Sequence, residues 1–112
     1  MKSDDVYLKQ ILDSVIKIKL FIRGVNSSQF LTDQKTQSAV IMQLALIGEL
    51  SKKISKNTQS HVDLPWKDIA GFRDRAIHDY YQIDLGIVWE TISADIPILK
   101  KAIQEYLQTT NE

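Results

Sequence analysis

Residues 8–22, LKQILDSVIKIKLFI, decide the fold class, because their apolar side chains return at every third or fourth position. That spacing places the apolar side chains on one face of an α-helix, which we predict over about residues 4–23. Gly24 and the polar residues that follow it are expected to end this helix. The apolar positions are Leu8, Ile11, Leu12, Val15, Ile18 and Ile22.

The same period returns further along the chain. Thr32 or Asp33 is a suitable N-cap for a second helix, which should run to about Lys56. Its apolar face would be formed by Val40, Ile41, Leu44, Ile47, Leu50 and Ile54.

Three shorter helices are predicted in the second half of the chain. A polar loop over residues 57–63 precedes Pro65, which suits the first turn of a third helix. Asp84 can cap a fourth helix, and Asp95 with Pro97 marks the start of a fifth. No long alternation of β-branched residues competes with this interpretation. We therefore expect an all-α, up-and-down bundle of about five helices.

Length and composition limit the class of protein further. The chain of 112 residues suits a single domain, residues 1–112. Fourteen basic and fourteen acidic residues give a net charge of zero, so any contact with nucleic acid must be local. The lack of cysteine excludes disulfides, thiolate zinc sites and cysteine nucleophiles. No apolar run approaches the roughly 20 residues that span a bilayer, and we expect a cytoplasmic protein without a cofactor or metal.

Residues 71–84, GFRDRAIHDYYQID, hold the pattern Arg-x4-His-x-Tyr, formed by Arg73, His78 and Tyr80. Arginine binds phosphate through a planar fork of donors, and histidine exchanges protons near neutral pH. The pattern therefore points to phosphodiester chemistry. A plainer interpretation is a solvated helix face on which Arg75 and Asp79, four residues apart, form an ion pair.

Helix geometry separates the two groups that this chemistry needs. Arg73 and His78 are five residues apart, about 140° around an ideal helix axis, so they do not share a face. Either the helix loosens before His78, or the two groups converge from different subunits. Tyr80 also points elsewhere in a regular helix, so the pattern is expected to lie across a helix end.

Three stretches, taken in this order, resemble the HEPN superfamily, in particular its HepT toxin branch. They are residues 44–55, LALIGELSKKIS; residues 64–84, LPWKDIAGFRDRAIHDYYQID; and residues 87–99, IVWETISADIPIL. The chain departs from the family pattern in two places. Asp74 stands where the family commonly has asparagine, and Trp66 follows Pro65 directly.

This resemblance implies the toxin of a type VII toxin–antitoxin system, a metal-independent endoribonuclease that acts on RNA, such as tRNA or mRNA, as a homodimer. Arg73 and His78 would be the catalytic pair at the dimer interface. Tyr80 would be adenylylated, and silenced, by an MntA-type nucleotidyltransferase antitoxin. Asp74 and Glu49 would support the site, with Asp74 either orienting His78 or repelling RNA phosphate.

Elementary chemistry gives reasons for part of this assignment. Cleavage needs both a base and an acid, whereas one chain supplies a single motif histidine; a twofold axis would bring in a second His78. Glu49 lies among apolar residues and is expected to be partly buried and to pair either with an unspecified lysine or arginine or with Arg73, because a lone buried carboxylate is costly. Gly48 is expected to permit close helix packing. The alternative function is a non-catalytic helical module that binds a nucleotide or a partner protein.

Overall fold

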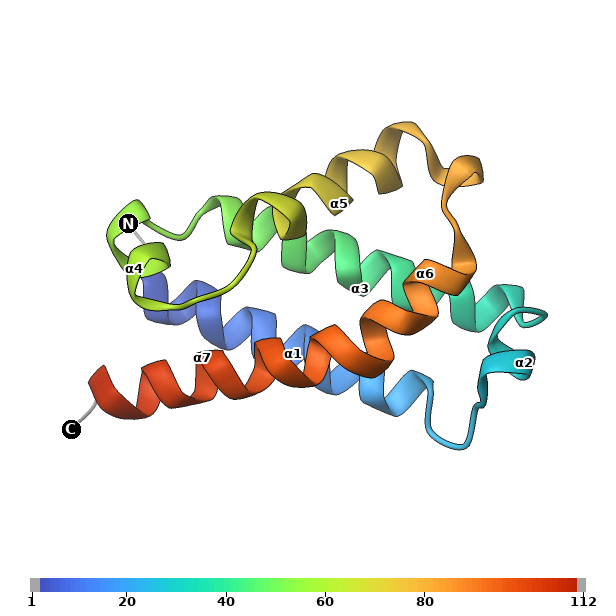
Figure 1. Cartoon of the computed structure of the whole chain (residues 1–112), viewed down its shortest axis with the longest axis horizontal. Helices are drawn as coiled ribbons and strands as arrows, with labels where there is room; N and C mark the ends of the chain where they lie inside the picture. The colour runs from blue at the N-terminus through green and yellow to red at the C-terminus, as the bar shows by residue number, and fades with distance from the viewer. Residues whose placement is uncertain (1–2, 111–112) are drawn as a thin grey trace.

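The computed structural model describes residues 3–110, and all regular structure within that range is helical (Figure 1). This confirms the predicted all-α class. Four longer helices form the body of the molecule, and short helices and turns connect them. The elements are α1 (Asp4–Phe21), α2 (Ser27–Phe30), α3 (Gln34–Lys52), α4 (Lys56–His61), α5 (Trp66–His78), the 3-10 turn η1 (Tyr80–Gln82), α6 (Leu85–Glu90), the π-helical turn η2 (Thr91–Asp95) and α7 (Ile96–Thr110).

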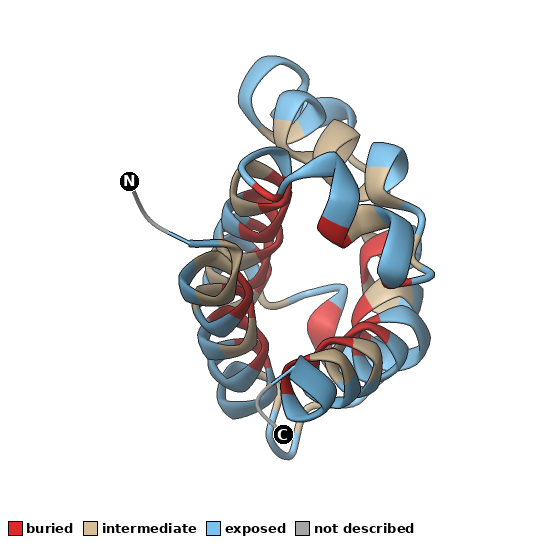
Figure 2. Cartoon of the chain, turned by 90° about the vertical axis from the view of Figure 1, so that its left-hand side faces the viewer, coloured by how far each residue is buried: buried red, intermediate tan, exposed pale blue. Residues whose placement is uncertain are grey.

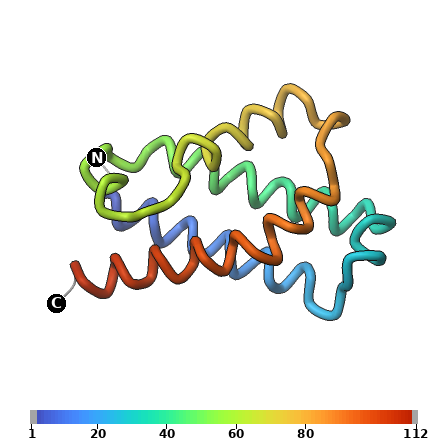
Figure 3. Tube along the Cα trace, viewed as in Figure 1, coloured from blue at the N-terminus to red at the C-terminus, as the bar shows by residue number. Residues whose placement is uncertain are grey.

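The long helices are arranged in the order α7, α1, α3, α5, each packed against the next. Figure 3 follows the same path, with α1 and α3 running side by side along the length of the molecule. Helix α5 packs mainly on α3, so one of its sides faces away from the bundle. None of the described helices is both long and apolar enough to cross a membrane.

The core lies between the inward faces of α1, α3 and α7, where the buried positions of Figure 2 gather. The apolar period that predicted the first helix accounts for its buried residues, since four of them are fully excluded from solvent: Leu8, Ile11, Val15 and Ile18. Trp66 and Trp89 are partly buried against the same core. Burial of this apolar surface is the main source of stability for the fold.

Helix α4 corrects the prediction of a polar loop over residues 57–63, because Lys56–His61 is helical. The second long helix also ends at Lys52, earlier than predicted. Ser55 caps α4, and the carboxylate of Asp4 accepts hydrogen bonds from the Ser55 and Thr58 hydroxyls at 2.5 and 2.6 Å. Partial burial raises the pKa of Asp4, but these hydrogen bonds outweigh burial and hold the pKa below its usual value.

Helix α2 is a second short element that the sequence did not indicate. Asn26 and Gln29 form a reciprocal capping box at its start. Phe30, at its end, is fully buried, and its ring lies 5.2 Å from that of Trp89 on α6. The connection between α1 and α3 is thereby anchored to the core.

The predicted fourth and fifth helices are joined into one helical segment. Asp84 caps α6 as predicted, accepting hydrogen bonds from the Gly86 and Ile87 amides at 2.9 and 3.2 Å. The predicted restart at Asp95 and Pro97 is wrong, because the chain passes through the wide turn η2 without breaking. Proline lacks an amide hydrogen and crowds the preceding turn, and a π-helical turn tolerates both effects.

Candidate functional site

Gly48 brings the two helices of the candidate site into direct backbone contact. A Cβ at this position would lie 2.8 Å from the Ile69 carbonyl oxygen and 2.9 Å from the Arg73 Cβ. Both distances are too short for any side chain. The expected packing role of Gly48 is therefore confirmed, and it places Arg73 of α5 beside α3.

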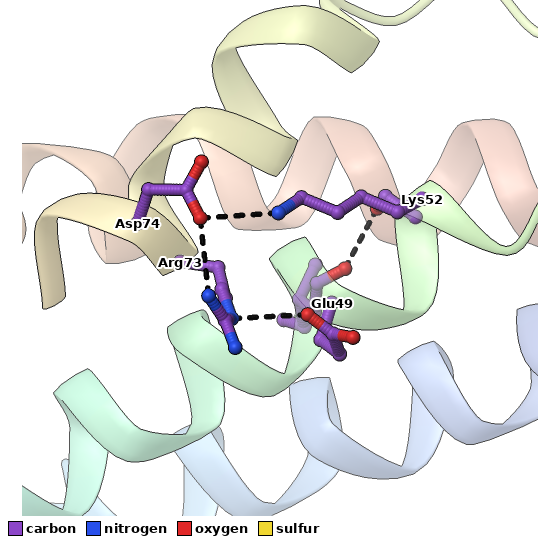
Figure 4. Close-up of polar contacts among 6 residues, drawn as sticks. Glu49, Lys52, Arg73 and Asp74 are labelled. Atoms are coloured by element: carbon purple, nitrogen blue, oxygen red, sulfur yellow. Dashed lines mark hydrogen bonds and ion pairs between the residues drawn. The ribbon is translucent and has the colours of Figure 1, made fainter. Parts of the chain in front are cut away.

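Arg73 is held between two carboxylates (Figure 4). Its Nε lies 3.0 Å from Oε2 of Glu49 on α3, and its Nη1 lies 3.2 Å from Oδ1 of Asp74. The side chains of Arg73 and Glu49 remain 34% and 43% exposed. The pairing of Glu49 with Arg73 that we expected is present, and it fixes the guanidinium while leaving part of it accessible.

Asp74 belongs to the same network through a second cation. Lys52, near the end of α3, places its Nζ 3.1 Å from Oδ1 of Asp74, the oxygen that Arg73 also contacts. The hydrogen bonds from Lys52 and Arg73 hold the pKa of the Asp74 carboxyl below its usual value. Asp74 is thus engaged by two cations, and no hydrogen bond or ion pair between described residues joins it to His78.

His78 is the last residue of α5 and is exposed. The helix is continuous from Arg73 to His78, so the alternative in which it loosens before His78 is wrong for this chain. Between residues 3 and 110 no hydrogen bond or ion pair links the two side chains, in keeping with their separation of about 140° around the axis. One chain alone therefore does not join them.

Tyr80 lies beyond the helix end, as expected. Asp79 leaves the helical conformation at φ −131° and ψ 38°, and η1 follows. The Tyr80 hydroxyl lies 3.0 Å from the Ser38 hydroxyl on α3, and either oxygen can donate. The ring of Tyr81 meets that of Tyr80 almost perpendicularly, at 86° and 5.6 Å between centroids.

Exposed apolar side chains lie next to the Arg73 network. Leu46 precedes Glu49 by three residues on α3, Met42 lies one turn earlier, and Ile77 follows Arg73 by four residues on α5. Residues at these spacings share a helix face. Met42, Leu46 and Ile77, here called the apolar patch, are 56%, 41% and 58% exposed.

A groove of 370 Å³ lies on the other side of α5, between this helix, α3 and α7. Arg75 lines the groove; it is two residues from Arg73, about 200° around the helix, and so points the opposite way. Its guanidinium lies 5.6 Å from the centre of the Phe72 ring. No ion pair between Arg75 and Asp79 is present in the described part of the chain, so the plainer interpretation of a salt-bridged helix face is not supported.

Comparison with known proteins places this sequence in a family. The family model described as "Ribonuclease HepT-like" matches residues 11–106. The chain belongs to the HepT-like ribonuclease family. The resemblance found in the sequence is therefore confirmed, and the matched HepT-like region includes Arg73, His78 and Tyr80.

Two curated relatives illustrate the HepT-like similarity over nearly the whole chain. "Probable ribonuclease HepT" of Thermococcus cleftensis is 40% identical over 100 residues, covering 88% of this chain and 91% of the relative. "Putative RNase TTE0752" of Caldanaerobacter subterraneus subsp. tengcongensis is 37% identical over 109 residues, covering 96% and 97%. No solved structure matches the chain.

Sequence reasoning missed two participants in this HepT-like site. Ser38 meets Tyr80 across 42 positions of chain, and Lys52 meets Asp74 across 22. Nothing in the local pattern around Ser38 indicates its contact. Lys52 is one of several lysines near the end of α3, and the sequence does not indicate its partner, because that partner depends on how α5 packs on α3.

Proposed function

We propose that this protein is an RNA-cleaving toxin, a metal-independent endoribonuclease whose catalytic residues are Arg73 and His78. The observation that carries the proposal is a partly exposed guanidinium fixed by Glu49 and Asp74, one and a half turns from an exposed imidazole, in a HepT-like chain. We place this activity in the cytoplasm.

The chemistry follows from the two side-chain types. The 2′-hydroxyl of the substrate attacks the adjacent phosphorus, and the bond to the 5′-oxygen breaks, leaving a cyclic phosphate and a 5′-hydroxyl. One imidazole removes the 2′ proton, and another gives a proton to the leaving oxygen. Arg73 stabilises the negative charge that builds on the phosphoryl oxygens, and its two carboxylate contacts hold it in place before substrate arrives.

A twofold homodimer supplies the second imidazole. Because α5 is regular up to His78, Arg73 and His78 of one chain diverge, and the geometry favours convergence across two subunits. The apolar patch borders Arg73 on both α3 and α5, and its exposed side chains suit an isologous interface centred near the site.

Analytical ultracentrifugation tests the dimer. We expect Ile77→Glu to yield a monomer that no longer cleaves RNA, because a charge would be buried at the interface. Ile87→Glu is the matched control, since Ile87 is 60% exposed and lies outside the patch. A monomeric parent protein that cleaves RNA at full rate would refute the shared site.

Cleavage itself is tested with tRNA and total RNA in the presence of EDTA. We expect His78→Ala and Arg73→Ala each to lower the rate by about a hundredfold or more. Arg75→Ala is the matched control, because it removes the same charge from the opposite side of the same helix. Activity that disappears with EDTA, or that survives both active-site substitutions, would contradict the proposal.

Tyr80 is the proposed acceptor of AMP from an MntA-type nucleotidyltransferase. Its hydroxyl already lies beside Ser38, so a bulky phosphodiester there would displace that contact and add negative charge on the residue two positions after His78. With antitoxin and ATP, Tyr80→Phe should show no mass increase, whereas Tyr81→Phe should be labelled normally. If Tyr80→Phe gains the same mass as the parent protein, Tyr80 is not the acceptor of AMP.

The second candidate is a non-catalytic module that binds a nucleotide or a partner. It is favoured by the balance of charge around Arg73, because the two cations Arg73 and Lys52 are neutralised by the carboxylates of Glu49 and Asp74. Binding of RNA or nucleotide without any cleavage by the parent protein would support this candidate over the enzyme.

A further inference from the structure

Among the described residues, Tyr81 is the most exposed aromatic residue, with 95% of its surface accessible to solvent. It lies three residues after His78, on the turn η1. We propose that Tyr81 is a stacking platform for a nucleobase of single-stranded RNA next to the bond that is cleaved. This inference rests on the proposed ribonuclease function and adds a substrate-positioning residue to it.

The Tyr81 ring contacts the rest of the protein through the ring of Tyr80. Its perpendicular contact with Tyr80 joins it to a ring whose hydroxyl is bonded to Ser38 on α3. A chain of contacts therefore runs from the bundle to Tyr81, while the exposure of Tyr81 leaves a ring face open.

The charges near η1 favour a base over a phosphate as the group that binds here. Asp79 and Asp84 flank the turn, and both carboxylates are exposed. They disfavour close approach of the RNA backbone. Stacking on tyrosine is insensitive to this, because every base offers an uncharged aromatic face.

Stacking also suits the class of RNA that the reaction needs. Attack by a 2′-hydroxyl requires a backbone that can turn to bring its oxygen in line with phosphorus, which unpaired nucleotides allow. Recognition of unpaired RNA commonly uses splayed bases stacked on aromatic side chains.

Binding is measured in the His78→Ala background, so that no substrate is consumed, by fluorescence anisotropy of a short labelled single-stranded RNA. Tyr81→Ala should weaken binding by about tenfold, the effect typical of one lost base stack. Tyr81→Phe and Tyr81→Trp should bind like the His78→Ala parent, because they keep an aromatic face. Ile16→Ala is the control for loss of an exposed apolar side chain elsewhere, since Ile16 is 52% exposed and lies on α1.

The outcomes separate this inference from the ribonuclease proposal. Suppose that the protein with His78 cleaves RNA, but that in the His78→Ala background Tyr81→Ala does not change RNA affinity. The stacking role is then wrong, and the ribonuclease proposal stands. Weakened binding with Tyr81→Ala, in a protein that never cleaves RNA, supports base stacking on Tyr81 but overturns the enzyme and with it any position beside a cleaved bond. Sedimentation distinguishes a third result: if Tyr81→Ala becomes monomeric, Tyr81 is an interface residue and the inference is wrong.

Discussion

The bundle core and helix α5 differ in how completely their apolar side chains are buried and in how far ion pairs hold them in place. Between α1, α3 and α7, apolar side chains are fully excluded from water. Helix α5, by contrast, contains no buried residue. Its partly buried apolar residues pack against that core, and it is tied to α3 by the close approach at Gly48 and by the Arg73–Glu49 and Lys52–Asp74 ion pairs. Stability and the candidate chemistry are therefore separable, and substitutions can address one without the other.

The largest effect should come from the core side of this comparison. Phe30→Ala removes a fully buried ring that packs on Trp89, which should cost about 3–5 kcal/mol of the free energy of unfolding. That is a large share of the stability of a domain this size. Urea unfolding measures it. A loss below about 1 kcal/mol would show that the core is less tightly packed than described.

Gly48→Ala tests the contact between the two regions. The added methyl group must push α5 away from α3, at a cost of about 1–3 kcal/mol, offset by up to about 1 kcal/mol of helix propensity. Displacement of Arg73 should lower the rate of RNA cleavage strongly, whereas the free energy of unfolding should change only by the small amount given above. Thermal melts and cleavage rates together measure this.

Gly71→Ala is the matched control within α5. The nearest atom to its added methyl group is the flexible Arg75 Nη1 at 3.7 Å, so only the gain in helix propensity should remain. If both glycine substitutions behave alike, the close approach at Gly48 does not position α5.

Glu49→Gln tests positioning at a smaller energetic scale. The Glu49–Arg73 pair is partly exposed, so its loss should cost less than about 1 kcal/mol of stability. The rate should nevertheless fall by about tenfold to a hundredfold through kcat, since Arg73 loses its fixed orientation. Glu49→Asp should restore part of the rate. Asp13→Asn, which breaks the exposed pair with Lys17, should change neither quantity.

The smallest effect is a pH dependence at Asp74. Its pKa is lowered in the folded state, so its contribution is present at neutral pH and is lost as pH falls through the acid range, below about pH 4. The difference in Tm between the parent and Asp74→Asn should therefore shrink as the pH falls below about 4 and vanish once Asp74 is protonated in the folded protein. A difference that stays constant down to low pH would show that charge plays no part.

The long helices could be predicted from the sequence because burial repeats with the helical period. Asp33 and Asp84 were identifiable as caps because an N-cap needs only its own helix, and both bond the first-turn amides. That Glu49 pairs with a cation could also be predicted, but full burial of its carboxylate is not the reason, since the side chain is 43% exposed.

What the sequence could not reveal depends on distant parts of the chain. Helix α4 has the polar sequence KNTQSH and is secured by Asp4, more than fifty positions earlier. Ser38 meets Tyr80 only once α5 lies on α3. Pro97 reads locally as a helix start, and only the tertiary structure shows that a wide turn absorbs it.

That wide turn, Thr91–Asp95, also determines which face of α7 points toward the core. Each residue added to or removed from a helix turns everything beyond it by about 100°. Deleting a single residue here would swing Leu99, Ile103 and Leu107 away from the interior, although α7 itself would lose none of its own sequence. Insertions and deletions in this segment should therefore be far less tolerated than ordinary substitutions at the same positions.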